Sequence, residues 1–269
     1  MCVPGVGYVF FAAIMIVIGI LGLIKGDFVA IWQSVPKSIP ARLGLAYLCA
    51  VVALGSGSGL LFQRAAAPAA RLLLVYLMLW LLLIKAPVVW HAPAVGVSWE
   101  DCAETAVMVA GAWILYAWFA ADWDRQRFGF ATGDSGMGIA RALYGLALIP
   151  FGVAHFAYIR ETAALVPAWL PAHMAWAYFT GCTYILAGLA VTLGVYGRMA
   201  AALSALQMAI FTVLVWGPIV AAGHKNAFQL NESLISCALT ASGWVVAISY
   251  RGLPWLHRGR PAHKTVRSP

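Results

Sequence analysis

The chain has 269 residues, of which 63% are hydrophobic and only 10% are charged. Because soluble domains of this size carry about 25% charged residues, this composition excludes an ordinary water-soluble globular protein and indicates a lipid environment. The formal net charge of +8 does not indicate nucleic-acid binding, because the basic residues lie in short connections and in the tail after Arg251 rather than in one cluster.

The predicted elements are long apolar segments, each close to the length of about 20 residues with which a helix spans the hydrocarbon core of a bilayer. The sequence therefore predicts an all-α, polytopic membrane protein of about eight transmembrane helices. No Lys or Arg precedes the first segment, so we expect a retained span there rather than a cleaved signal peptide. The segments cover residues 8–24, 43–62, 70–90, 103–121, 139–158, 174–194, 199–221 and 230–250.

A shift of 131 residues superimposes the first half of the chain on the second. Pro36 then falls on Pro167, and Pro87 falls on Pro218. Each copy holds four helices, an even number, so the sequence predicts two parallel repeats related by a pseudo-twofold axis along the membrane normal. Pro87 and Pro218 are predicted to end the third and seventh helices near their outer ends.

The distribution of basic residues predicts the orientation of the chain in the membrane. Eleven of the 17 Lys and Arg residues fall on the side that holds both termini, and six fall on the other side. Short cytoplasmic loops carry the excess of Lys and Arg, so we predict that both termini are cytoplasmic. The predicted units are a first four-helix repeat over residues 1–130, a second over residues 131–250 and a basic cytoplasmic tail over residues 251–269.

The predicted outer side carries most of the carboxylates and four of the six histidines. Through the repeat, Asp101 corresponds to Glu232 at the starts of the fourth and eighth helices, and Arg42 corresponds to His173. Glu104 lies deeper in the fourth helix, where an ionisable group is costly and is often functional. The competing interpretation is that these carboxylates cap helix N-termini at the water interface. The four histidines are His91, His155, His173 and His224.

His155 is the histidine that the fifth segment singles out. Pro150 is expected to kink this helix, and Gly152 permits the close approach of a neighbouring helix or a ligand. His155 follows about one turn later, near the outer interface, where the first copy has Ile24. The second copy has thus gained a polar group at this position. The competing interpretation is an interfacial histidine that is bonded to a neighbouring helix.

Other patterns complete the set of candidates. His173 and Trp176 share one face of the sixth helix, although Trp at a helix end is also typical of the interfacial aromatic belt. The sequence contains no common hydrolase or nucleotide-binding motif, and its five cysteines form no CxxC pair, so no metal site is predicted. A haem is the less favoured cofactor, because no His pair has the spacing of a bis-histidine site. The candidate ligand-binding residues are Arg42, Asp101, Glu104, Gly152, His155, His173, Trp176 and Glu232.

Residues 139–221 resemble the DoxX-like family of bacterial membrane proteins. The resemblance is carried by Arg141, Gly152 and His155, which match an Arg near the start of the family's first helix and a Gly followed by a basic residue near its end. The segment 165–171 (LVPAWLP) and Gly188 add to it. The first copy lacks the Arg and the basic residue. The resemblance implies a bacterial inner-membrane protein linked to quinone-dependent oxidation of sulfur compounds or to thiol stress, here as a fused duplication.

These observations favour a quinone-linked redox subunit. The quinone head group would lie near the outer interface, with His155 or His173 as hydrogen-bond donor and Glu104 or Glu232 as proton acceptor. A membrane or redox partner subunit would supply the electron carrier. Two alternatives stay open: a transporter or carrier of a small amphipathic ligand, and a non-catalytic assembly subunit held by close packing of small residues.

Overall fold

The computed structural model describes residues 6–29, 35, 37–223 and 226–257, and every regular element in them is a helix. Within this part of the chain, eight helical spans are long and apolar enough to cross a membrane. A helix satisfies its own backbone hydrogen bonds, which lipid cannot do. The chain is therefore an all-α multi-pass membrane protein, and this prediction is confirmed.

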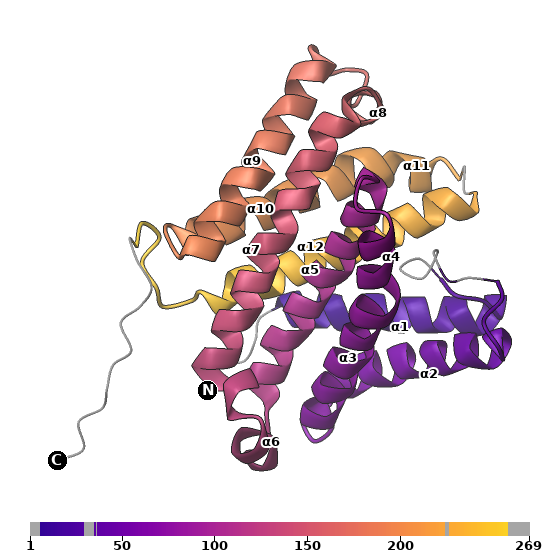
Figure 1. The fold of residues 1–269 in the computed structure, drawn as a ribbon, viewed down its shortest axis with the longest axis vertical. Helices are drawn as coiled ribbons and strands as arrows, with labels where there is room; N and C mark the ends of the chain where they lie inside the picture. Colours follow the sequence, from indigo (N-terminus) through magenta and orange to yellow (C-terminus); the bar gives the residue numbers. More distant parts are fainter. Residues whose placement is uncertain (1–5, 30–34, 36, 224–225, 258–269) are drawn as a thin grey trace.

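The spans are built from the following elements, joined by short connections (Figure 1). They are α1 (Val6–Lys25), α2 (Arg42–Leu60), α3 (Ala66–Trp80) with η2 (Leu81–Lys85) and α4 (Ala86–His91), α5 (Gly96–Phe119), α7 (Gly133–Ala157), α9 (His173–Leu193), α10 (Gly197–Phe211) with η4 (Thr212–Trp216) and α11 (Gly217–Ala221), and α12 (Ala227–Ser249). The short elements α6 (Asp122–Arg127), η3 (Gly129–Ala131) and α8 (Ile159–Ala164) lie in the connections.

The two halves repeat the same unusual backbone features at the predicted spacing of 131 residues. Ala41 and Ala172, which precede α2 and α9, both have left-handed backbones with φ of 54° and 57°. The third and seventh spans each contain one π-helical turn, η2 and η4, followed at once by Pro87 or Pro218. The prediction that these prolines end the helices is wrong. A π turn shifts the hydrogen-bond register just before a residue that has no N–H to donate, and the helix then continues.

The pseudo-twofold axis passes through the crossing of α5 and α12, the two most buried spans. Gly111 of α5 and Ser242 of α12 are 131 residues apart and are in contact: a Cβ atom on Gly111 would lie 3.0 Å from the Cα of Ser242. Contact between a residue and its own counterpart is the signature of twofold symmetry. Around this pair, α1 packs on α2, α7 on α9, α3 on α5 and α10 on α12.

Helix packing corrects one correspondence between the halves. A Cβ atom on Gly19 would meet Leu54, and one on Gly152 would meet Ile185, the counterpart of Leu54. The first and fifth spans therefore align at a spacing of 133, so the counterpart of His155 is Gly22 rather than Ile24. An ungapped comparison cannot detect this, because the connection after the first span is two residues longer.

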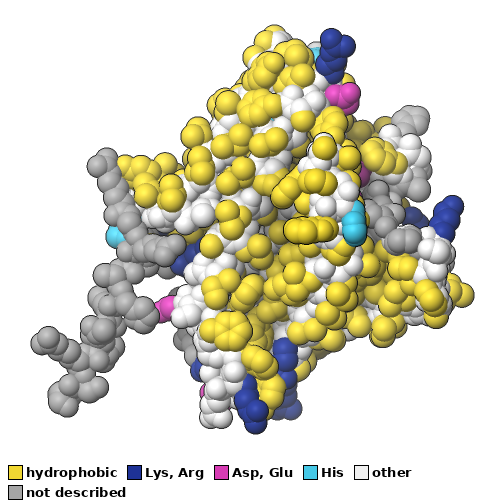
Figure 2. All heavy atoms as spheres, viewed as in Figure 1, with side chains coloured by type: hydrophobic (Ala, Val, Ile, Leu, Met, Phe, Trp, Pro, Cys, Tyr) yellow, Lys and Arg dark blue, Asp and Glu magenta, His cyan; other side chains and the backbone are white. Residues whose placement is uncertain are grey.

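The surface agrees with a lipid environment. Figure 2 shows hydrophobic side chains over most of this face, with Lys and Arg at the ends of the molecule. Leu186 and Leu203 are among the large apolar side chains that the spans expose. We call the end formed by residues 92–95 and 158–172 with the adjoining helix ends the carboxylate end, and the end formed by residues 61–65 and 120–132 the arginine end. His224 and the tail from residue 258 onwards lie outside the described residues.

Candidate functional site

A cavity of about 370 Å³ lies at the carboxylate end, between α5, α7, α8, η4 and α12. Its walls bring together five ionisable side chains that are far apart in the sequence. Two come from α5 in the first half, and the others come from the second half, so the cavity lies across the interface of the repeats. These side chains are Glu100, Glu104, His155, Glu161 and Glu232.

Helix geometry places these groups around the cavity. Glu100 and Glu104 lie one turn apart on α5 and therefore face the same side. Glu232 lies in the first turns of α12, which crosses α5. The hydroxyl group of Tyr158 accepts a hydrogen bond from the Val97 N–H at 3.2 Å. This contact holds the start of α8, and with it Glu161, over the start of α5.

The orientation of His155 follows from one hydrogen bond. Its Nδ1 lies 2.7 Å from the carbonyl oxygen of Phe151, one turn earlier on α7. A carbonyl oxygen only accepts, so Nδ1 carries the proton, and this tautomer is assigned from the bonding geometry. The other ring nitrogen, Nε2, is thus the atom available to a ligand in the cavity. It accepts a hydrogen bond when the ring is neutral and donates one when the ring is protonated.

A second cavity of about 750 Å³ adjoins the first and is lined almost entirely by apolar side chains of α9 and α10. His155, Tyr184 and Phe211 line both cavities, and the rings of His155 and Tyr184 lie 5.4 Å apart between their centroids. These two rings therefore separate a carboxylate-lined space from an apolar one. The apolar cavity also borders side chains exposed on the outside of the spans, including Leu186 and Leu203.

One polar group interrupts the apolar cavity. Gln207 accepts a hydrogen bond from the Thr183 hydroxyl at 2.7 Å and donates one from Nε2 to the Thr180 carbonyl at 3.2 Å. All three residues line this cavity, at the turn of α9 that also holds Tyr184. A ligand in the apolar cavity therefore finds amide and hydroxyl groups at the same depth as His155.

The structure brings four of the predicted site residues to these cavities. His155, Glu104 and Glu232 line the carboxylate cavity, and Trp176 lines the apolar one. These contacts depend on the helix arrangement and leave the function of the residues as a prediction. His173, at the start of α9, lines neither cavity.

Three other candidates have contacts that engage them elsewhere. Arg42 forms an ion pair with Asp27 at 2.7 Å, and Asp101 forms one with the buried Lys85 at 3.4 Å. A Cβ atom on Gly152 would lie 2.6 Å from the Gly181 carbonyl. This glycine therefore lets α7 and α9 approach closely, so its position is explained by helix packing rather than by a ligand.

Sequence reasoning did not select Glu100, Glu161, Tyr158 or Tyr184 as site residues. Glu100 could have been found from its spacing of four residues before Glu104. The other three carry no such signal, because their place at the cavity depends on how α8 folds over it and on how α9 is rotated. Among the described residues, no group of three or more His, Cys, Asp or Glu side chains is arranged to hold a metal ion.

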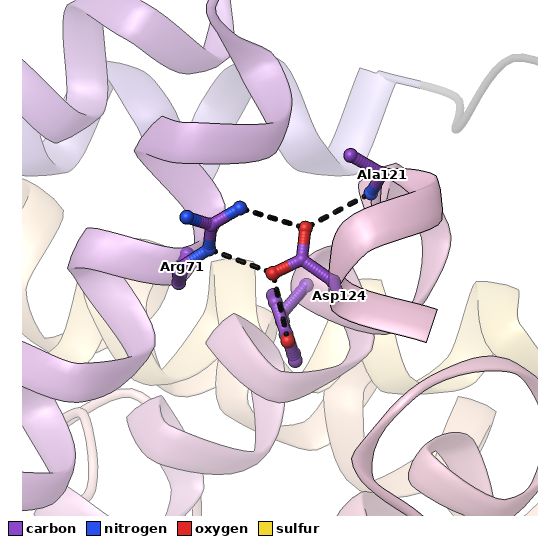
Figure 3. A network of polar contacts seen from close by, with 4 residues as sticks. Arg71, Ala121 and Asp124 are labelled. Carbon is purple, nitrogen blue, oxygen red and sulfur yellow. Dashed lines mark hydrogen bonds and ion pairs between the residues drawn. The ribbon is translucent and has the colours of Figure 1, made fainter. Parts of the chain in front are cut away.

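A second polar network lies at the arginine end (Figure 3). The fully buried carboxylate of Asp124 receives Arg71 Nε at 2.7 Å and Arg71 Nη2 at 2.8 Å. It also accepts bonds from the Tyr116 hydroxyl at 3.1 Å and the Ala121 N–H at 3.0 Å. Burial alone would raise the pKa of Asp124, but these hydrogen bonds outweigh burial and hold its pKa below the ordinary value. With every acceptor position in use, this network is structural and joins α3 to α5 and α6.

A family model described as a domain of unknown function, DUF8561, matches residues 144–236. The match begins in α7 and ends in α12, and it contains His155, Glu161, Tyr184, Phe211 and Glu232 of the cavity walls. Glu100 and Glu104, in α5, lie outside it. No curated protein and no solved structure gives a significant match to the chain.

Proposed function

We propose that this protein is a quinone-binding, redox-linked membrane subunit and a divergent, duplicated relative of the DoxX-like family. One observation carries the proposal: His155 and Tyr184 stand between a carboxylate-lined cavity and an apolar cavity bordered by lipid-facing side chains. A quinone has this division of character, with a polar head group and an apolar tail. Membrane quinones also reach their sites from the lipid phase, which suits a cavity between α9 and α10.

The polar cavity supplies the groups that quinone chemistry requires of the protein. Oxidation of a quinol releases two protons and two electrons. His155 Nε2 can accept one hydroxyl proton, and a carboxylate such as Glu104 can accept the other. The two electrons pass to a flavin or metal centre of a redox partner subunit. In the reverse direction the same groups donate the two protons to the quinone.

The proposal includes the orientation of the chain in a bacterial inner membrane. With both termini cytoplasmic, as the Lys and Arg distribution favours, the carboxylate end faces outward. Protons from quinol oxidation would then leave on the outer side through Glu161, which lines the cavity and is exposed. Reporter fusions at residue 257 and in the 92–95 connection test this orientation. A cytoplasm-dependent signal from the second fusion would overturn it.

The direct test is to purify the chain in lipid nanodiscs, extract it with organic solvent and analyse the extract by mass spectrometry. We expect about one quinone per chain, and we expect His155→Ala and Glu104→Gln to lose most of it. His173→Ala is the matched control, because this histidine lies at the same end but lines neither cavity. Quinone retention that is equal in all four proteins would overturn the proposal.

A carrier of another amphipathic ligand is the second candidate. It is favoured by the size of the apolar cavity, which is about twice that of the polar one. A stoichiometric lipid in place of quinone in the same extract would favour this function. An extract with no bound molecule, obtained from the folded protein, would favour the assembly subunit.

A further inference from the structure

The first half of the chain fills the place that corresponds to the cavities with its own residues. After α1 the chain folds back, and the ring of Phe28 meets the ring of Trp80 edge-on, with 5.6 Å between centroids and 74° between planes. The counterpart of Trp80, at the spacing of 131 shared by α3 and α10, is Phe211. In the second half Phe211 borders both cavities.

Arg42 holds this folded-back segment in place. Its guanidinium group binds the Asp27 carboxylate at 2.7 Å and lies over the Phe28 ring at 5.1 Å. Val29, the next residue, is only 2% exposed. The counterpart of Arg42 is His173, which lines neither cavity. The clamp is therefore specific to the first half.

The polar walls differ between the halves in the same sense. In the first half Lys85, 5% exposed, is paired with Asp101. Their counterparts are Trp216 and Glu232, and both line the carboxylate cavity. Where the first half has an internal ion pair, the second half thus has an aromatic side chain and a carboxylate that border open space.

We infer that the second half binds a single planar ring against Phe211, in the place that Phe28 occupies in the first half, and that the first half is closed by its own chain. The inference rests on the proposed function and adds to it a binding pose, a ring-positioning residue and a stoichiometry of one. Phe211 is prepared for this contact, because the ring of Trp216 packs edge-on against it at 6.4 Å. A ring in this place also lies beside His155, which borders the same two cavities.

The test uses the full chain in nanodiscs and decylubiquinone, a benzoquinone with a ten-carbon tail, with binding measured by equilibrium dialysis and native mass spectrometry. We expect saturation at one molecule per chain. Phe211→Ala should weaken binding about tenfold, and Phe211→Leu, which keeps most of the volume, should still weaken it about threefold because the ring contact is lost. Phe130→Ala is the control, because Phe130 is an exposed phenylalanine at the arginine end. The acyclic alcohol n-decanol should not displace the quinone.

The outcomes separate this inference from the proposed function. Two molecules per chain, or full affinity in both Phe211 variants with binding still dependent on His155, would overturn the inference and leave the proposed function standing. Displacement by n-decanol at equal concentration would also overturn the preference for a ring. No binding to the folded wild-type chain would overturn the proposed function and this inference with it.

Discussion

Asp124→Asn is the sharpest perturbation that the arginine end offers. Both carboxylate oxygens of Asp124 receive two donors, including one each from Arg71. An asparagine must place its NH₂ group toward one of these pairs, so a donor faces a donor in either rotamer. The Tyr116 hydroxyl can rotate away, but the guanidinium and the Ala121 N–H cannot stop donating.

The size of the effect follows from burial. Breaking a fully buried ion pair costs about 3–5 kcal/mol, and Arg71 is 38% exposed, so solvent screening reduces this to about 2–3 kcal/mol. For a chain of this size the melting temperature should then fall by about 5–10 °C. Asp122→Asn is the matched control, since Asp122 is 92% exposed and pairs with Arg125 at 3.6 Å. We expect it to change stability by less than about 0.5 kcal/mol.

The same variant gives a pH dependence with a defined sign. The pKa of Asp124 is lowered in the folded protein, so its stabilisation is complete above the unfolded-state pKa of about 3.9. The stabilisation is lost as the pH falls through the lower folded-state pKa. Thermal melting in detergent should therefore show a constant gap between wild type and Asp124→Asn from about pH 7 to pH 5, and a shrinking gap below about pH 4. A gap that grows on acidification, or one no larger than that of the control, would refute this reasoning.

Two further predictions concern helix packing and capping. Gly145→Ala should destabilise the α7–α9 contact by about 1–3 kcal/mol, because the new Cβ would lie 2.8 Å from the Gly188 carbonyl. Gly138→Ala, on the same helix with no atom within 4 Å, should be neutral or stabilising in the same melting assay, and equal melting temperatures for the two variants would contradict the packing argument. Asn226→Ala removes the cap of α12, where Asn226 accepts from the Gln229 N–H at 2.8 Å. It should cost about 1 kcal/mol and speed amide exchange in the first turn of α12, whereas unchanged exchange there would show that the cap contributes little.

The sequence was sufficient to predict the spans and the repeat. A membrane helix requires a continuous apolar segment of a given length, which can be read along the chain. The even number of spans in each half then places Glu104, His155 and Glu232 at the same end of the bundle. It also makes the repeat visible at a constant spacing, and the left-handed residues Ala41 and Ala172 and the two π turns follow that spacing.

The sequence could not predict which of these residues would meet. Asp101 and Glu104 are three residues apart on α5, yet Asp101 pairs with Lys85 and Glu104 lines the cavity. Likewise, Arg42 and His173 occupy matched positions, but only Arg42 clamps a folded-back segment.

The physical reason lies in what each property depends on. Span length, spacing and the end of the bundle at which a residue lies depend on chain order alone. Lateral contacts depend on the rotation of each helix about its axis, on the register between packed helices and on the path of the connections. A connection longer by two residues changes the register of α1 relative to α7, and a folded-back Phe28 fills one half while leaving the other open. Only the tertiary structure decides these features, because they arise from packing between segments distant in the chain.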